Sequence, residues 1–134
     1  MAAECSVDGW HTLELVSAVP DTAKIRRWTR SILGDLGEDD LLDVLMVITE
    51  LAANVFDHAR LPARLRLRRS DEPCVVNVVA EDASPDSPLL RPSTPDSVRG
   101  RGMVIVNRLA ERWGVVHRTV GKAVWAVIPC APAR

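Results

Sequence analysis

The spacing of hydrophobic residues changes along the chain, and each spacing predicts a different element. Residues 11–17 alternate between apolar and polar side chains, as a half-buried or edge strand does. Between Pro20, which a first helical turn tolerates, and Gly34 and Gly37, which end a helix, apolar residues recur at helical spacing. A second, longer helix is predicted over about 39–59, because acidic residues at its start suit the positive end of a helix dipole.

The second half of the chain predicts strands, a long loop and one more helix. Two strands are predicted at 63–69 and 74–81, joined by a turn at 70–73. Residues 83–99 interleave prolines with serines, a composition that sustains neither a helix nor a strand ladder, so a long loop is expected. A loop of this length in so small a domain is usually functional, often as a lid. A helix at 102–112 and a strand pair at 113–119 and 123–128 complete the predicted order.

This order predicts an α+β fold, a two-layer sandwich with helices on one face of a mixed, mostly antiparallel sheet. The 134 residues suffice for one compact domain, so 1–134 is expected to be a single domain. Apolar residues make up 47% of the chain, and no apolar run approaches the roughly 20 residues that cross a bilayer. The first ten residues lack the basic and apolar pattern of a signal peptide. A cytoplasmic protein without membrane contact is therefore expected.

Cysteine content and charge narrow the class of function. Cys5, Cys74 and Cys130 are odd in number, widely separated and not arranged as C-x-x-C, so neither a disulfide framework nor a zinc site is predicted. A reducing compartment fits this pattern, with Cys74 as a small buried hydrophobic residue. The net charge of −1 disfavours nucleic-acid binding, and the alternating Arg and Leu of 64–69 are typical of a strand with one solvent face.

The second predicted helix carries the first candidate chemistry. Glu50, Asn54 and His58 follow one another at steps of four, so a carboxylate, an amide and an imidazole line up on one side of a largely apolar helix. A solvent-facing polar stripe would give the same pattern. A carboxylate among apolar neighbours, however, needs a cavity, a metal or a partner, because burying it bare is costly.

Two further segments flank the long loop. Asp82 ends an apolar strand just before the loop, where both functional carboxylates and ordinary turn-starting ones occur. Gly100, Arg101 and Gly102 close the loop and lead into a helix, where backbone N–H groups can point at an anion. A lone G-x-G far more often marks only the boundary between a loop and a helix, without binding a ligand.

In this order the three segments resemble the Bergerat ATP-binding fold of the histidine-kinase-like ATPases. Residues 49–58, T-E-L-A-A-N-V-F-D-H, look like the family's N box, E-L-x-x-N-x-x-x-H. Asp82 falls at the adenine-recognising aspartate, 100–102 at the glycine-rich phosphate box and 83–99 at the ATP lid. The end of the chain, through 112–115 and 121–125, is similar to the small anti-sigma-factor serine/threonine kinases. The resemblance covers about residues 12–128, the expected core of the domain.

The resemblance implies an enzyme, a serine/threonine protein kinase that regulates transcription by binding Mg-ATP and phosphorylating or sequestering a protein partner. That partner would be a sigma factor or an anti-anti-sigma-like protein; a homodimer is allowed, and no direct contact with nucleic acid is implied. Each candidate residue receives a role. Asn54 would coordinate Mg²⁺, Glu50 would be the general base, His58 would shape the phosphate end, Asp82 would accept the adenine amino group, and Gly100, Arg101 and Gly102 would wrap the phosphates.

Two departures from the family pattern leave an alternative open. The adenine box is usually D-x-G, whereas this chain has Asp82, Ala83 and Ser84. A hydroxyl residue commonly stands on the final strand beside the aspartate, where the sequence suggests Ala123. The alternative is therefore a nucleotide-weak or non-catalytic module that acts on the same fold through protein contacts alone.

Overall fold

The computed structural model of the chain describes residues 3–5, 8–16, 21–58, 62–83, 98–119 and 121–131, with side chains described except at 3–5, 57–58 and 98–102. Three helices and six strands follow one another in these segments. They are β1 (Ala3–Cys5), β2 (His11–Leu15), α1 (Thr22–Leu33), α2 (Glu38–His58), β3 (Ala63–Asp71), β4 (Cys74–Asp82), α3 (Val98–Leu109), β5 (Arg112–His117) and β6 (Lys122–Pro129).

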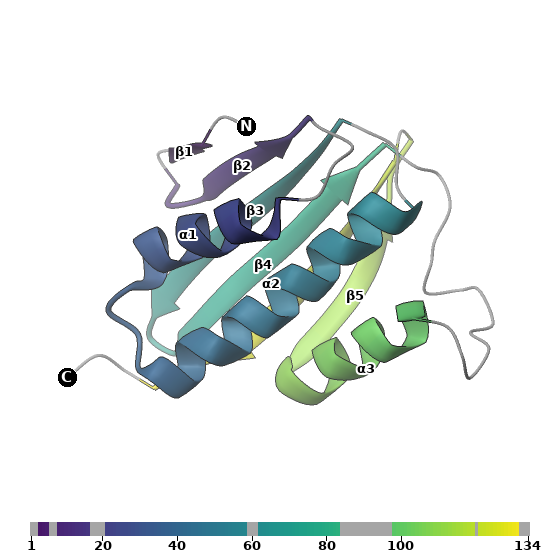
Figure 1. Cartoon of the computed structure of the whole chain (residues 1–134). Helices are drawn as coiled ribbons and strands as arrows, with labels where there is room; N and C mark the ends of the chain where they lie inside the picture. Colours follow the sequence, from purple (N-terminus) through teal and green to yellow (C-terminus); the bar gives the residue numbers. More distant parts are fainter. Residues whose placement is uncertain are drawn as a thin grey trace.

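The strands form one sheet in the order β1-β2-β3-β4-β6-β5, and every pairing in it is antiparallel. All three helices lie on the same face of this sheet (Figure 1). Along β4 buried and half-buried residues alternate strictly, as expected when helices cover one face only. The predicted α+β sandwich is confirmed, and within the described strands the sheet contains no parallel pair.

The core lies between the helices and the sheet. Asp21 caps α1, accepting a hydrogen bond from the backbone N–H of Lys24 at 3.0 Å, and α1 buries Ile25, Trp28 and Leu33. Helix α2 is 21 residues long and packs across β4 and β6, burying Val44, Ile48, Leu51 and Val55 among others. No helix of the described segments is long and apolar enough to cross a membrane.

Element boundaries differ from the prediction mainly near α3. This helix begins at Val98 and ends at Leu109, whereas 102–112 was expected. Gly100 and Gly102 therefore lie inside its first turns and not ahead of it. Glycine costs a helix about 1 kcal/mol, but α3 packs against α2 and buries Val106, and such packing overrides local propensity. The three-residue strand β1 was not predicted, and 84–97, most of the expected lid, lie outside the described residues.

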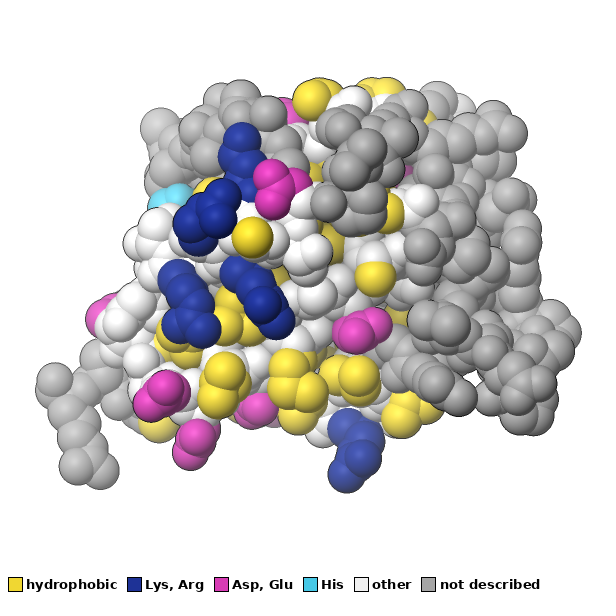
Figure 2. Space-filling model, in the orientation of Figure 1, with side chains coloured by type: hydrophobic (Ala, Val, Ile, Leu, Met, Phe, Trp, Pro, Cys, Tyr) yellow, Lys and Arg dark blue, Asp and Glu magenta, His cyan; other side chains and the backbone are white. Residues whose placement is uncertain are grey.

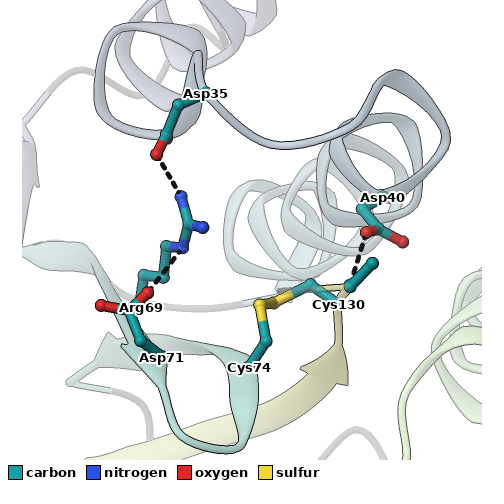
Figure 3. Close-up of a disulfide and its surroundings, with 7 residues drawn as sticks. Asp35, Asp40, Arg69, Asp71, Cys74 and Cys130 are labelled. Carbon is teal, nitrogen blue, oxygen red and sulfur yellow. Dashed lines mark hydrogen bonds and ion pairs between the residues drawn. A yellow bond between two sulfur atoms is a disulfide. The ribbon is translucent and has the colours of Figure 1, made fainter. Parts of the chain in front are cut away.

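The prediction of no disulfide is wrong, because Cys74 and Cys130 are joined (Figure 3). The two cysteines are 56 residues apart in sequence. Val75 pairs with Pro129 across β4 and β6, and this pairing brings the Cα atoms of Cys74 and Cys130 to 5.1 Å from each other. The N–H of Cys130 also donates to the carbonyl of Cys74 at 3.0 Å. Cys74 is buried as expected, but as half of a bridge. The argument from unpaired cysteines for a reducing compartment therefore falls.

Candidate functional site

Helix α2 presents Glu50 to a groove on the helical face of the molecule. The groove has a volume of about 320 Å³, and residues of all three helices line it. Arg26 and Arg30 of α1 lie on one side, Ile105 of α3 lies on the other, and Leu42, Leu45, Met46, Thr49 and Glu50 come from α2. On this face basic side chains gather over α1, beside hydrophobic side chains that lie over α2 (Figure 2). The carboxylate predicted to be functional is thus half-buried beside cationic and apolar neighbours.

Asn54 lies one turn further along α2 and is buried. Its amide nitrogen donates to the sulfur of Met103 in α3 at 3.1 Å. This contact places the first half of α3 against the C-terminal half of α2. Because the nitrogen faces the sulfur, the amide oxygen is the atom that could serve a hard cation such as Mg²⁺.

Asp82 is held by a contact that the sequence did not predict. The ammonium of Lys122, the first residue of β6, lies 3.1 Å from Oδ1 and 3.0 Å from Oδ2 of Asp82. Both side chains are only 2% exposed. Asp82 shares the helix-facing side of β4 with the buried Val76, Val78 and Ala80. The carboxylate therefore lies in the layer between helices and sheet, already bound to a buried cation.

The pairing of β4 with β6 corrects the position assigned to the missing hydroxyl residue. Asp82 pairs with Lys122, while Ala123 pairs with Glu81. Because neighbouring residues of a strand point to opposite faces, Ala123 lies on the face away from Asp82. The residue beside the predicted adenine-binding carboxylate is therefore Lys122.

The remaining site residues are described only through their backbone. His58 is the last residue of α2, and Gly100, Arg101 and Gly102 belong to the first turns of α3. The free N–H groups of a helix are those of its first four residues, here 98–101, so they include two of the three predicted phosphate-binding residues. The prediction that Gly100 and Arg101 precede the helix is wrong, while the proximity to a helix N-terminus is retained.

The structure brings some of the candidate residues together. Glu50 and Asn54 share one side of α2, and the C-terminal ends of α2 and β4 lie at the same end of the molecule (Figure 1). A second hollow, of about 260 Å³, touches Asp82, but charged residues of the uncovered sheet face, Glu14, Arg64, Glu81 and Arg118, line it. Neither hollow contains both Asn54 and Asp82. Among the described residues no group of three His, Cys, Asp or Glu side chains could hold a metal ion.

Two features of this region were missed by sequence reasoning. Lys122 was left between the two strands predicted at 113–119 and 123–128, although it is one of only two lysines in the chain and stands at the start of a strand. A buried aspartate requires a partner, and this requirement was the available signal. The basic wall of the groove, Arg26 and Arg30, sits on exposed positions of α1 that gave no signal separate from an ordinary amphipathic helix.

Comparison with known proteins places this arrangement in a family. The sequence matches the histidine kinase-like ATPase domain over residues 16–128. No curated protein matches significantly. A crystal structure of the RsbU and RsbW domains of Rv1364c from Mycobacterium tuberculosis is similar, with a TM-score of 0.66 and 15% identity over 92% of this chain and 34% of that chain. The histidine kinase domain of the Erythrobacter litoralis EL346 blue-light activated histidine kinase is similar with a TM-score of 0.51 and 18% identity, over 81% of this chain and 59% of that chain.

Because the sequence identities are low, the two structural likenesses show the fold alone. This chain also spans less than two thirds of either structure. The family match, by contrast, extends from the end of β2 to within β6 and so includes α2, Asp82 and α3. This chain belongs to the family of histidine kinase-like ATPase domains.

Proposed function

We propose that this chain is an ATP-binding regulatory protein, a serine/threonine kinase of the anti-sigma-factor type. One observation about α2 carries the proposal. Glu50 lines a groove, and Asn54, one turn later on the same side of the helix, donates a hydrogen bond to Met103 of α3. The side chains proposed as base and as magnesium ligand thereby belong to one helix. The family match supports nucleotide binding, and the likeness to a structure containing an RsbW domain supports this branch of the family. Regulation of transcription would place the protein in the cytoplasm.

Nucleotide would bind between the C-terminal half of α2, the end of β4 and the start of α3. Asn54 offers an amide oxygen to Mg²⁺, which usually keeps several waters and binds phosphate oxygens as well. The unpaired N–H groups of the first turn of α3, with its positive dipole end, suit the phosphates. Asp82, paired with Lys122, would accept a hydrogen bond from the amino group of the base. His58 and the backbone of 100–102 would complete the phosphate end.

Glu50 would act as the general base. Its carboxylate takes the proton from a serine hydroxyl of the partner as the serine oxygen bonds to the γ-phosphorus. The bond between that phosphorus and the β,γ-bridging oxygen breaks, and ADP leaves. Magnesium, when bound, would neutralise the charge on the phosphate oxygens. Arg26 and Arg30 line the same groove as Glu50.

The protein partner would dock on the helical face. Leu42 and Met46 of α2 are 46% and 47% exposed, and they line the groove that ends at Glu50. A partner with an apolar segment lying along this groove would bring a hydroxyl to the carboxylate. A sigma factor or an anti-anti-sigma-like protein is the class of partner that this branch of the family implies.

The test is a calorimetric titration with ATP, with and without Mg²⁺, followed by a phosphate-transfer assay with a partner co-purified from the native host. Wild type should bind ATP more tightly with Mg²⁺ and transfer phosphate. The variant Glu50→Gln keeps the size of the side chain without its basicity, so it should bind ATP like wild type and lose transfer. Transfer by this variant at the wild-type rate would exclude Glu50 as the base.

A second candidate is a module that acts through protein contacts without catalysis. The ion pair of Asp82 with Lys122 favours it, because both acceptor oxygens already face a cation. The same titration separates the two functions. Wild type without measurable affinity for Mg-ATP at millimolar concentration would establish the non-catalytic module.

A further inference from the structure

The buried pair of Asp82 and Lys122 changes what the base end of the proposed nucleotide site can recognise. A lone carboxylate only accepts hydrogen bonds. It binds the exocyclic amino group of adenine and repels the carbonyl oxygen O6 of guanine. An adjacent ammonium, 3.0 to 3.1 Å from both oxygens, adds N–H donors at the same place. The pair therefore offers one acceptor and one donor side by side.

Both purine bases match such a pair along one edge. Adenine presents a donor, its amino group, next to the acceptor N1. Guanine presents an acceptor, O6, next to the donor N1–H. An ammonium has three N–H groups, and Asp82 engages it through two oxygens, which leaves a third N–H for a ring or carbonyl acceptor. The positive charge also cancels the repulsion between the carboxylate and O6.

A purely structural role explains the pair less well. β4 and β6 are already paired from Val75 to Asp82, so the ends of the strands do not need an additional link. A buried ion pair adds little stability compared with apolar residues of similar size. Lys122 is also fixed in place by its neighbour, since Gly121 takes a φ of +84° and packs directly on the backbone of Asp82.

We propose that Lys122 is a specificity-determining residue, which makes the base site accept guanine nucleotides as well as adenine nucleotides. This inference rests on the proposed nucleotide-binding function and names its substrate class, purine nucleoside triphosphates. Asp82 accepts from the base, and Lys122 donates to N1 of adenine or to O6 of guanine. The charge of Lys122 is the feature that admits guanine.

The test measures the affinities of wild type, Lys122→Met and Lys122→Arg for ATP and GTP with Mg²⁺ by calorimetry. Wild type should bind the two within about tenfold of each other. Hydrogen bonds to a charged donor correspond to roughly ten- to hundredfold in affinity, so Lys122→Met should weaken GTP relative to ATP by at least about tenfold. Lys122→Arg keeps the charge and should keep the wild-type ratio. Thermal unfolding of each variant checks that it folds.

Wild type alone also tests the inference, which covers a failure of Lys122→Met to fold. Inosine triphosphate shares O6 and N1–H with GTP and should bind with similar affinity. A preference of wild type for ATP over GTP and inosine triphosphate above about tenfold would overturn the inference and leave the proposed ATP-binding function standing. An unchanged ratio in folded Lys122→Met would also overturn it. Failure of wild type to bind any of the three would remove the proposed function and this inference together.

Discussion

At the scale of single residues, the contact between Asp82 and Lys122 depends on the glycine that precedes Lys122. Gly121 has a φ of +84°, in the region that L side chains rarely adopt, and a Cβ atom there would lie 1.9 Å from the carbonyl oxygen of Asp82. The backbone of the turn can therefore approach the end of β4 only because this residue has no side chain. This close approach also places Lys122 beside the carboxylate of Asp82.

Replacing Gly121 with Ala should lower the free energy of unfolding by about 2 kcal/mol or more, since it combines backbone strain with a backbone clash. Gly37→Ala is the matched control, because no atom lies within 4 Å of the position of its Cβ, and it should change stability little. Chemical denaturation of both variants measures the difference. Equal stability of the two variants would contradict this account of the turn.

The placement of single residues was predictable from sequence where it follows a helical period. Steps of four placed Glu50 and Asn54 on one side of a helix, and the structure keeps them there. The partner of Asp82 was not predictable in this way. Which residue of β6 faces Asp82 depends on the register between strands 40 residues apart, and a shift of one residue exchanges Lys122 for Ala123.

At the scale of elements, α2 begins in a crowded acidic environment. Glu38, Asp39 and Asp40 occupy its first turn, where the helix dipole favours negative charge. Asp40 also accepts a hydrogen bond from the N–H of Ala131 at 2.8 Å, which ties the start of the helix to the segment after β6 (Figure 3). Asp43 lies beyond this turn. Burial, followed by repulsion from Asp40 and Asp39, raises the pKa of its carboxyl above the ordinary value.

Asp43→Asn should therefore stabilise the protein at neutral pH by ~0.5 kcal/mol, the size of a like-charge helix pair. The raised pKa sets the sign. The ionised carboxylate is less favourable in the folded state, so wild type loses stability as pH rises through the folded pKa, and the variant does not. Denaturant unfolding of wild type and of the variant, at neutral pH and at pH 3, measures the gain in stability and its dependence on pH. A gain that persists undiminished at pH 3 would show that charge is not its cause.

The disulfide acts between elements, because it closes a long loop that contains α3 and β5. Such a bridge typically contributes 2–4 kcal/mol by restricting the unfolded chain, so a reducing agent should lower the melting temperature by roughly 10 °C. Cys130→Ala should unfold at this lower temperature with or without reductant. Cys5→Ala is the control and should respond to reductant as wild type does. Equal melting temperatures of wild type in oxidised and reduced form would exclude a bridge in solution.

At the scale of the whole molecule, the order of elements was sufficient to predict the layers. Each helix and strand from β2 to β6 was predicted in the observed order, and an α+β sandwich follows when every amphipathic face must be covered. Contacts distant in sequence were not predictable, because a period describes one element at a time. The bridge from Cys74 to Cys130 and the placement of Lys122 both arise from the neighbouring position of β4 and β6.

A ligand that binds only the folded domain must stabilise it as a unit, and this provides a test of the site as a whole. At a hundred times its dissociation constant, Mg-ATP should add about 2.7 kcal/mol and raise the melting temperature by roughly 10 °C. Asn54→Ala removes the proposed metal ligand and should lose most of this shift. Glu50→Gln changes the neighbouring turn of the same helix but no proposed nucleotide ligand, so it should keep the full shift.

Comparing Asn54→Ala with Glu50→Gln separates loss of a magnesium ligand from a general weakening of α2. Both variants alter α2, so a general weakening of the helix would reduce both shifts alike, whereas loss of a magnesium ligand reduces only that of Asn54→Ala. Repeating the scan with ATP and a chelator adds a second contrast, since removal of Mg²⁺ should bring wild type to the level of Asn54→Ala. A full shift in Asn54→Ala would place the metal elsewhere, even though Asn54 contacts Met103 in the first half of α3.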